Sequence, residues 1–479
     1  VHASRSTIPF EPERRYAASF HAREAGGLVC VKGAPERVLE MCEHTICDDD
    51  GTLAEFDRAK ELAAAERLMA DGFRVLALAD AETPEALAEG ATPAEPSGLV
   101  FLGLVAMDDP PREGVRAAMQ RCQEAGIHVV MVTGDHAITG RAIAARVGLA
   151  KSDAPVLTGR EIEALDDAAL QERIAGCRVV ARATPTDKLR VVRAAQEGGA
   201  FVAVTGDGVN DAPALRQADL GVAMGQSGND VAREAADLVI TDDDFSSIVA
   251  GVREGRVAYD NVRKVTYLLI STGAGEVLAV GTALTLGIPV PFTAVQLLWL
   301  NLVTNGIQDV ALAFEPPEPG VLKRKPRSPR EGIFDRMMIE RTLLAGAVFG
   351  FVGLGAFWGW LAEGRSVDEA RNLLVQLFVL FEILHIGNSR SETRSLFQMS
   401  PLANPILLVG TVAAMSVHGM ALYTPFFQEL LDLQPPSLEE WSSLVAMAAS
   451  IVVVMESHKA LRRRWPHTDG LRSRGSEIQ

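Results

Sequence analysis

Six long apolar runs in the second half of the chain constrain its fold more than any other feature of the sequence. Each run is about 20 residues long, enough for an α-helix to cross the hydrocarbon core of a bilayer. The first half of the chain has no run of this length. The runs argue against an ordinary soluble protein. They predict an all-α membrane part with six helices, at 265–287, 291–313, 342–362, 372–389, 404–424 and 441–460.

The charge is divided between the same two halves. Of the 479 residues, 46 are basic and 62 are acidic, so the formal net charge is −16. From Arg263 onward there are 19 acidic and 19 basic residues, and the whole excess of negative charge therefore lies in residues 1–262. An acidic soluble half argues against binding to nucleic acid, because proteins that bind it normally present a basic face.

The loops between the apolar runs differ in their content of basic residues. The connection 314–341, the segment 388–403 and the C-terminal tail are rich in Lys and Arg, whereas the alternate loops are poor in them. The positive-inside rule places the basic loops, and the soluble half with them, in the cytoplasm. The five cysteines form no CxxC pair, which favours reduced thiols in a cytosolic compartment. We expect a multi-pass protein of the plasma (inner) membrane.

The soluble half is expected to contain two domains. Residues 1–98 mix short strands and helices, and their last stretch, 80–98, is rich in proline and alanine like a surface loop or a boundary. Residues 99–250 alternate strands with helices, which predicts a parallel doubly wound sheet beginning with the strand Leu99–Ala106. With the membrane part, we therefore expect domains at 1–98, 99–250 and 251–479.

Two motifs follow strands of the second domain, at the sheet edge where parallel α/β proteins place their chemistry. In GDGVND, at 206–211, two carboxylates and an amide can hold Mg²⁺, which prefers oxygen ligands. In TGD, at 133–135, a hydroxyl and backbone N–H groups can bind phosphate, and Lys188 can neutralise its charge. The candidate catalytic residues are Thr133, Gly134, Asp135, Lys188, Asp207, Asn210 and Asp211.

Polar side chains within the apolar runs form a candidate cation path, since charged groups in a membrane are costly and usually functional. The candidate ligands are Glu276, Asn301, Thr304, Asn305, Asp309 and Glu392. Three of them are spaced i, i+4, i+8 and are expected to share one helix face. Gly306 between them allows local unwinding that would free carbonyl oxygens. For Glu382 and Glu456 an interhelical hydrogen bond or a membrane-end position is the preferred interpretation.

Taken together, several strings resemble those of P-type cation-transporting ATPases of the calcium-pump and sodium–potassium-pump branch. KGAPE at 32–36 resembles a signature of the nucleotide-binding domain, and DPPR at 109–112 resembles a hinge. MVTGD at 131–135 and GDGVNDAPAL at 206–215 resemble the phosphorylation domain, and 296–327 resembles the sixth membrane helix with the loop after it. The resemblance implies a haloacid-dehalogenase-like α/β phosphorylation domain, part of an α+β nucleotide-binding domain, and six transmembrane helices.

The resemblance also implies a function. The intact protein would use ATP and Mg²⁺ to form an aspartyl phosphate and to move a cation across a membrane, with Ca²⁺ as the first candidate. Asp207 would bind Mg²⁺. The residues that match nucleotide contacts are Phe10, Arg15, Lys32, Gly33, Arg74 and Arg182. At the cation path, Gly273 and Asn305 depart from the calcium-pump pattern, and Asp309 could restore the lost charge one turn further on. These departures leave the ion open.

Some family features are absent from the sequence: the DKTGT motif with the phospho-acceptor Asp, the TGES loop, and the first four membrane helices. All would precede Val1, so we expect a C-terminal piece that is inactive without the missing N-terminal part of the same pump. One alternative is a catalytically silent truncated pump. Another is a membrane-anchored phosphatase of the haloacid-dehalogenase type, which needs an acidic nucleophile. The acidic pair at 108–109 is followed by two prolines, which disfavours that role.

Overall fold

The protein is described here by a computed structural model, which covers residues 4–11, 14–23, 26–46, 52–84, 93–108, 110–328 and 331–464. Asp109, part of the 80–98 stretch and Cys47 lie outside the described residues. The chain forms two compact units. One comprises residues 1–251 with 322–329, and the other comprises 252–321 with 330–479.

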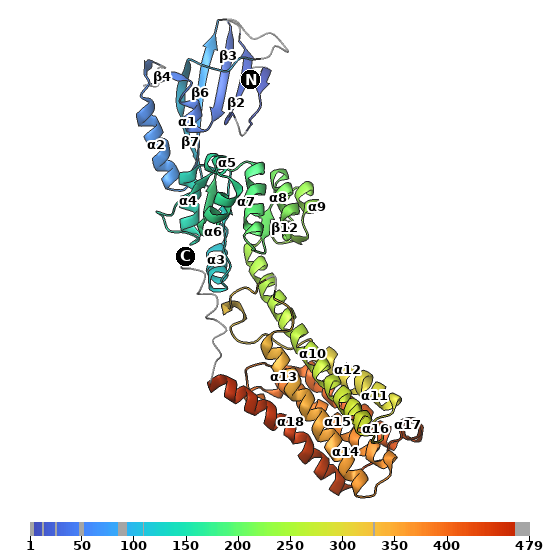
Figure 1. Cartoon of the computed structure of the whole chain (residues 1–479). Helices are drawn as coiled ribbons and strands as arrows, with labels where there is room; N and C mark the ends of the chain where they lie inside the picture. Colours follow the sequence, from blue (N-terminus) through green and yellow to red (C-terminus); the bar gives the residue numbers. More distant parts are fainter. Residues whose placement is uncertain are drawn as a thin grey trace. The chain divides into compact units, whose positions relative to one another are not determined.

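The first unit begins with a seven-stranded sheet of order β1-β2-β3-β6-β7-β4-β5 (Figure 1). Its strands are β1 Ser4–Ile8, β2 Tyr16–Ala22, β3 Gly27–Gly33, β4 Cys42–Ile46, β5 Leu53–Glu55, β6 Arg74–Thr83 and β7 Leu99–Met107. Its helices are α1 Pro35–Val38 and α2 Arg58–Ala70, the latter capped by the Asp57 carboxylate, which accepts from the Lys60 N–H. Alternate apolar residues of β2, among them Tyr16, Ala18 and Phe20, are buried in its core, as expected for a sheet with one covered face.

The strand Leu99–Ala106 was predicted correctly, but its place in a parallel sheet was wrong. β7 pairs antiparallel with β6 and parallel with β4, within the seven-stranded sheet. A continuous apolar run predicts a buried strand, but it does not predict which neighbouring strand that strand pairs with. The mixed sheet therefore takes in the first strand of the alternating region.

The rest of the first unit alternates short strands with helices. Its elements are α3 Val115–Glu124, β8 Met131–Val132, α4 Ala137–Arg146, β9 Leu157–Thr158, α5 Gly159–Ala164, α6 Asp167–Gly176, β10 Val179–Ala181, α7 Pro185–Glu197, β11 Ala203–Gly206, η1 Val209–Asp211, α8 Ala212–Gln217, β12 Leu220–Met224, α9 Asp230–Ala235 and β13 Leu238–Ile240. The strands are parallel, as predicted, but they form two three-stranded sheets of order β8-β10-β9 and β11-β12-β13 rather than one. β8 and β11 are each an edge strand in the described chain.

The second unit is helical. It holds most of α10 Phe245–Leu286, and then α11 Ala294–Trp299, η2 Leu300–Asn305, α12 Gly306–Leu312, α13 Arg336–Ala347, η4 Val348–Val352, α14 Gly353–Ala362, α15 Val367–Ser389, α16 Pro405–Tyr423, α17 Pro425–Leu431 and α18 Leu438–Arg464. Both η2 and η4 are π-helical. Short 3-10 turns occur at η3 Val321–Lys323, η5 Leu396–Gln398 and η6 Pro401–Ala403.

Five described helices are long and apolar enough to cross a membrane: α10, the run Arg336–Ala362, α15, α16 and α18. The prediction of six is not confirmed by this measure. The expected span 291–313 is divided into α11, η2 and α12, none of which is long enough alone. Its helical run nevertheless continues from Ala294 to Leu312 without unwinding at Gly306, because the irregularity takes the form of a π-helix. The local unwinding expected at Gly306 is therefore wrong.

Close helix packing fixes α10 in the second unit. A Cβ atom added to Gly275 would lie 2.3 Å from the Phe349 Cβ atom, so only glycine allows this approach of α10 to η4. Phe349 also packs against Phe381 of α15, with ring centroids 4.8 Å apart. The apolar window of α15 is 72% buried, whereas that of α18 is 22% buried. The polar side chains of α15 therefore face other helices more than lipid.

Candidate functional site

The loop after β11 is organised by Asp211. One carboxylate oxygen of Asp211 accepts an ion-paired hydrogen bond of 2.6 Å from Lys188 Nζ on α7. The other oxygen accepts from the backbone N–H groups of Asp207 and Gly208, at 3.3 and 3.2 Å. Gly206 makes this turn possible, because an added Cβ would lie 2.5 Å from the Asp211 Cβ atom. Three of the predicted catalytic residues are thus brought together.

Asp207 differs from Asp211 in having a free carboxylate. Its side chain is exposed, and no described residue hydrogen-bonds to it. Asn210 is exposed beside it in the same loop. An uncommitted carboxylate held by a fixed loop is a suitable donor for Mg²⁺, which binds through few protein carboxylates and keeps several waters. The residues present therefore fit a magnesium ion at Asp207.

The loop after β8 is fixed by hydrogen bonds to the chain after β10. Backbone bonds join Thr133 to Val180 and Ala183. The Thr133 hydroxyl accepts from the Asp135 N–H at 3.1 Å and donates to the Asp135 carboxylate at 3.2 Å, while Gly134 is exposed. Asp135 Oδ1 also lies 3.7 Å from Arg74 Nε. A residue of the predicted phosphate-binding motif thus contacts a residue that was predicted to bind the nucleotide.

Glu36, the last residue of the KGAPE string, joins two more of the predicted nucleotide contacts. Its carboxylate is ion-paired with Arg182, and Arg15 Nη1 lies 3.8 Å from the same oxygen. Burial lowers the pKa of the Arg182 guanidinium, and burial beside Arg182 lowers the pKa of His136. Sequence reasoning did not single out Glu36, although its position in the KGAPE string was a usable signal.

The remaining nucleotide candidates lie around β3 and the turn before β2. Gly33 is buried, and a Cβ there would lie 2.5 Å from the Arg15 carbonyl oxygen. Lys32 is exposed on β3, and Phe10 is 61% exposed. A hollow of about 890 Å³ is lined by Arg15 and Glu36 together with Thr7, Ile8, Pro9, Arg14, Tyr16, Arg37, Glu40, Pro93, Glu95 and Arg160. Phe10, Lys32 and Arg74 do not line it.

In the second unit, most of the predicted cation ligands come together between α10 and the 294–312 run. The Asn301 amide donates to both oxygens of Glu276, at 3.1 and 2.8 Å. One turn earlier on α10, Thr272 accepts from the Asn305 amide at 2.9 Å. Asp309 is buried, and its Oδ1 atom has no hydrogen-bond partner. The predicted face with spacing i, i+4, i+8 thus brings Asn301 and Asn305 to α10.

A further carboxylate lies beside these residues. The Thr304 hydroxyl donates to Oε2 of Glu382 on α15. Glu382 is fully buried. Within the described residues no three His, Cys, Asp or Glu side chains are grouped closely enough to hold a metal ion. The carboxylates of this region are therefore interleaved with amide and hydroxyl oxygens.

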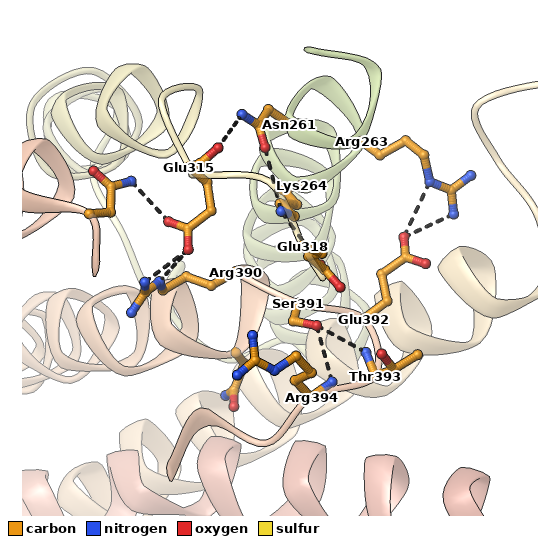
Figure 2. Close-up of polar contacts among 12 residues, drawn as sticks. Asn261, Arg263, Lys264, Glu315, Glu318, Arg390, Ser391, Glu392, Thr393 and Arg394 are labelled. Atoms are coloured by element: carbon orange, nitrogen blue, oxygen red, sulfur yellow. Dashed lines mark hydrogen bonds and ion pairs between the residues drawn. The ribbon is translucent and has the colours of Figure 1, made fainter. Parts of the chain in front are cut away.

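Glu392 does not join this group. Glu392 lies beyond the C-terminal end of α15 at Ser389. It pairs with Arg263, whose Nε and Nη2 atoms lie 3.2 and 2.9 Å from Glu392 Oε1 (Figure 2). Arg263 precedes Glu276 by 13 positions on α10, or about 20 Å at 1.5 Å per residue. The Arg263 side chain also binds Asp335. The role of Glu392 as a cation ligand stays a prediction that this geometry does not favour.

A buried ion pair lies in the same region (Figure 2). Glu315 and Arg390 are each 6% exposed, with Glu315 Oε1 2.9 Å from both Nε and Nη2 of Arg390. The other Glu315 oxygen accepts from the Asn404 amide at 2.9 Å, and the Glu315 backbone oxygen accepts from Asn261 at 2.7 Å. These contacts join α10, the segment after α12, and the ends of α15 and α16.

Two family models match parts of the chain. Residues 289–461 match the family model described as cation transporting ATPase, C-terminus, and residues 2–114 match the model described as P-type ATPase, cytoplasmic domain N.

Curated relatives match along most of the chain. The chain is 40% identical over 468 residues to the probable cation-transporting ATPase F of Mycobacterium tuberculosis, covering 96% of this chain and 51% of that protein. It is 36% identical over 450 residues to the cation-transporting ATPase pma1 of Synechocystis sp., covering 91% and 49%. It is 35% identical over 426 residues to a calcium-transporting ATPase of Bacillus subtilis, covering 88% and 47%. The chain spans about half the length of the curated relatives it matches.

Proposed function

The chain belongs to the P-type cation-transporting ATPases, and we propose that the intact protein is a pump that couples aspartyl-phosphate formation to transport of a divalent cation, with Ca²⁺ as first choice. The observation that carries this proposal is the polar group formed by Glu276, Asn301, Thr304 and Asp309 between apolar helices. The described chain gives the carboxylates of Glu276 and Asp309 no basic partner. An acid kept in such a place is best explained by a cation that binds there.

A hard divalent cation suits the donors. Glu276 and Asp309 supply negative charge, and Asn301, Thr304 and Asn305 supply neutral oxygens. Ca²⁺ takes six to eight oxygen ligands from carboxylates, amides and backbone carbonyls. The name of the Bacillus subtilis relative, a calcium-transporting ATPase, supports the same choice. The protein would be a multi-pass protein of the plasma membrane, with its first unit in the cytoplasm.

The first unit would bind ATP and Mg²⁺, which P-type ATPases use. Arg15, Arg74 and Arg182 would neutralise the phosphates, and Phe10 would stack on the base, with Lys32 and Gly33 beside them. Asp207 would hold Mg²⁺, which would neutralise charge that develops on the transferred phosphoryl group. Lys188 and Thr133 would contact that group, while Asp211 keeps Lys188 and the loop in position through its three hydrogen bonds.

The open edges of β8 and β11 support a further part of the proposal. β8 ends directly before TGD, and β11 ends at the first residue of GDGVND. A strand from the part of the relatives' length that this chain does not span would pair with both edges and join the two sheets into one sheet of haloacid-dehalogenase type. The phospho-acceptor Asp at the end of that strand would lie between Thr133 and Asp207.

Transport by the full-length protein tests the proposal. Inverted membrane vesicles carrying the protein should accumulate ⁴⁵Ca²⁺ when ATP and Mg²⁺ are added, and Glu276→Gln should weaken the response to Ca²⁺. Vesicles with Asp207→Asn serve as the matched catalytic control, because that residue lies in the other unit. Equal uptake by the wild type and by Asp207→Asn would contradict an ATP-driven pump. Uptake of Mn²⁺ or Mg²⁺ in place of Ca²⁺ would support an ATP-driven pump but contradict Ca²⁺ as the transported ion.

A further inference from the structure

His418 joins three helices of the second unit through hydrogen bonds at both of its ring nitrogens. It is buried on α16, and its Nδ1 atom lies 3.1 Å from Trp299 Nε1 of α11. Its Nε2 atom lies 2.7 Å from Gln376 Oε1 of α15. Because an indole N–H group can only donate, Nδ1 is the acceptor and Nε2 carries the proton that is donated to Gln376. The two contacts therefore fix His418 as a neutral imidazole in one tautomer.

The series of hydrogen bonds continues from Gln376 to the segment that precedes α18. Gln376 Nε2 donates to Asn372 Oδ1 at 3.4 Å, one turn earlier on α15, and Asn372 Nδ2 donates to the Gln434 backbone oxygen at 3.0 Å. The Gln434 N–H in turn donates to Asn372 Oδ1 at 3.0 Å. Gln376 and Asn372 are both buried. Since the members of this series are bonded to one another, the series holds α11, α15 and α16 in one arrangement.

α17 holds the start of the 294–312 run as well. Gln296, fully buried and one turn before Trp299, donates from its amide to the Leu431 backbone oxygen at 2.9 Å. The Trp299 ring packs against Phe427 of α17, with ring centroids 5.5 Å apart. The position of Trp299 is therefore set by a ring contact with α17 and by a hydrogen bond to α16.

The residue held in this way lies directly before the candidate cation ligands. Trp299 ends α11, and Asn301, which donates to Glu276, lies two residues further on in η2. A π-helical segment departs from the regular hydrogen bonding of an α-helix, so contacts on either side of it help to decide where its side chains lie. Beyond η2, a Cβ atom added to Gly410 of α16 would lie 2.8 Å from the Ala311 Cβ atom of α12. α16 therefore supports the ligand-bearing run both before and after η2.

We propose that His418 is a positioning residue of the cation site, which holds Trp299 so that Asn301 and Glu276 meet in the geometry that binds the cation. This inference rests on the proposed pump function and adds a residue that does not itself contact the ion. Loss of a merely structural residue would lower the melting temperature without a selective effect on cation affinity. Loss of a positioning residue weakens the affinity but leaves the ATPase rate at saturating cation close to that of the wild type, because ATP is hydrolysed in the other unit.

Cation binding and ATPase activity of the full-length protein test the inference. We would measure equilibrium binding of ⁴⁵Ca²⁺ without ATP, Ca²⁺-stimulated ATPase activity, and the melting temperature of each variant. His418→Leu removes both hydrogen bonds and should weaken Ca²⁺ binding about tenfold, since a buried donor left without its partner costs about that factor in an equilibrium constant. Ser416→Ala on the same helix is the matched control and should bind Ca²⁺ like the wild type, because the Ser416 hydroxyl is exposed and donates to the Val412 oxygen within α16.

Two conservative variants separate the two bonds of His418. His418→Asn keeps an acceptor near the position of Nδ1, whereas His418→Gln keeps a donor near the position of Nε2. If His418 acts through Trp299, the Asn variant should retain more of the Ca²⁺ affinity than the Gln variant. Trp299→Phe removes the N–H group but keeps a ring against Phe427, so it should weaken binding as His418→Leu does. Combining Trp299→Phe with His418→Leu should add little further loss, because both remove the same bond.

Unchanged Ca²⁺ affinity in both His418→Leu and Trp299→Phe would overturn the inference and leave the proposed pump function intact, provided that the wild type shows Ca²⁺-stimulated activity. A loss in which affinity, maximal rate and melting temperature fall together, with nothing restored in His418→Asn, would also overturn it. If the wild type binds none of Ca²⁺, Mn²⁺ and Mg²⁺, the proposed function fails and the inference fails with it. Should His418→Leu fail to fold, Trp299→Phe with wild-type affinity is enough to overturn the inference.

Discussion

Lys188 Nζ lies 2.6 Å from Asp211 Oδ1, and this ion pair joins the start of α7 to the loop after β11. Because Asp211 also accepts two backbone N–H groups of the loop, one carboxylate holds both the lysine and the turn. Asp207, four residues earlier, is left free. Substitutions of the two aspartates are therefore expected to have different effects on activity and on thermal stability.

Asp207→Asn should lower the ATPase activity of the full-length pump about 10²–10³-fold, the usual cost of losing one electrostatic element at a reacting centre. Its melting temperature should stay unchanged, because the side chain is exposed and makes no described bond. Asp211→Ala should lower both activity and melting temperature. Activity measured against Mg²⁺ concentration checks the first claim. Wild-type turnover and Mg²⁺ dependence in Asp207→Asn would remove that residue from the site.

The isolated chain should form no acid-stable, hydroxylamine-sensitive phosphoenzyme from ATP, because no DKTGT motif occurs in it. The assay uses γ-³²P-labelled ATP, acid quenching and a hydroxylamine wash, with the full-length protein as the positive control. Labelling of the isolated chain on an aspartate would show that it carries a nucleophile after all.

Asp309→Asn should reduce cation-stimulated ATPase activity of the full-length pump far more than Glu456→Gln does. Asp309 has an unpartnered buried oxygen, whereas Glu456 is bonded to a backbone N–H and to Lys459. Activity measured against Ca²⁺, Mn²⁺, Mg²⁺ and Na⁺ concentration separates affinity from turnover. The double change Asn305→Asp with Asp309→Ala should keep some transport if the charge has only moved by one turn. An unaltered ion response in Asp309→Asn would make that residue an interhelical hydrogen-bonding group.

Asp243 should stabilise the first unit in a pH-dependent way. The Gln226 N–H donates to its carboxylate at 3.0 Å and the Ser227 N–H at 2.7 Å, and these bonds lower the pKa of Asp243 to about 2. An unfolded Asp has a pKa of about 3.9. The folded-state value is depressed, so the stabilisation is complete above about pH 4 and is lost as the pH falls through about 2.

Asp243→Asn should therefore lower the melting temperature at pH 7, and the difference from wild type should shrink between about pH 4 and pH 2.5. Asp153→Asn is the control for the general effect of removing one charge, because Asp153 is exposed and its side chain makes no hydrogen bond or ion pair in the described chain. A melting difference that stays constant down to pH 2.5 would mean that the carboxylate charge is not what stabilises this turn.

Glu315→Gln should destabilise the second unit by about 3–5 kcal/mol, because it leaves the buried Arg390 guanidinium without its counter-charge. The double variant Glu315→Leu with Arg390→Met should recover much of this loss. Arg336→Gln, which breaks an exposed i, i+4 pair with Glu340, should change stability by only about 0.3–0.5 kcal/mol. Denaturation in detergent, followed by circular dichroism, measures all three. A small effect of Glu315→Gln would show that the pair is hydrated.

Local structure followed from the sequence wherever one residue pattern excluded the alternatives. Residues 99–250 were expected to alternate strands with helices, and α7 is one of these helices, with Pro185 in its first turn and the Thr184 side chain as its cap. Strand pairing was not predictable in the same way. Leu99–Met107 is continuous and apolar in either sheet, so nothing in its own residues distinguishes β6 from a parallel neighbour.

The membrane site shows a similar limit. Glu276, Asn301 and Asp309 were singled out because they are polar groups in apolar runs, and their role as cation ligands stays a prediction. The contact between Glu392 and Arg263 joins positions 129 residues apart. No local pattern around Glu392 reveals it. The KGAPE string marks Glu36, but the pairing of Glu36 with Arg182, 146 residues away, was not predictable from it.

The π-helical segment at Leu300–Asn305 also decides where the 294–312 run tolerates a change of chain length. A π-turn accommodates about one more residue than an α-turn, so deletion of a single residue within it would return the run to regular α-helix and leave the later side chains on their present faces. A one-residue deletion at Ile307 or Gln308, in the regular helix α12, would instead rotate every later side chain by about 100° about the helix axis. Asp309, buried at present, would then turn toward the neighbouring face. Among homologous ATPases, a one-residue gap within the segment should therefore leave the transported ion unchanged, whereas a gap just after it should mark a change of ion even where all the acidic residues are retained.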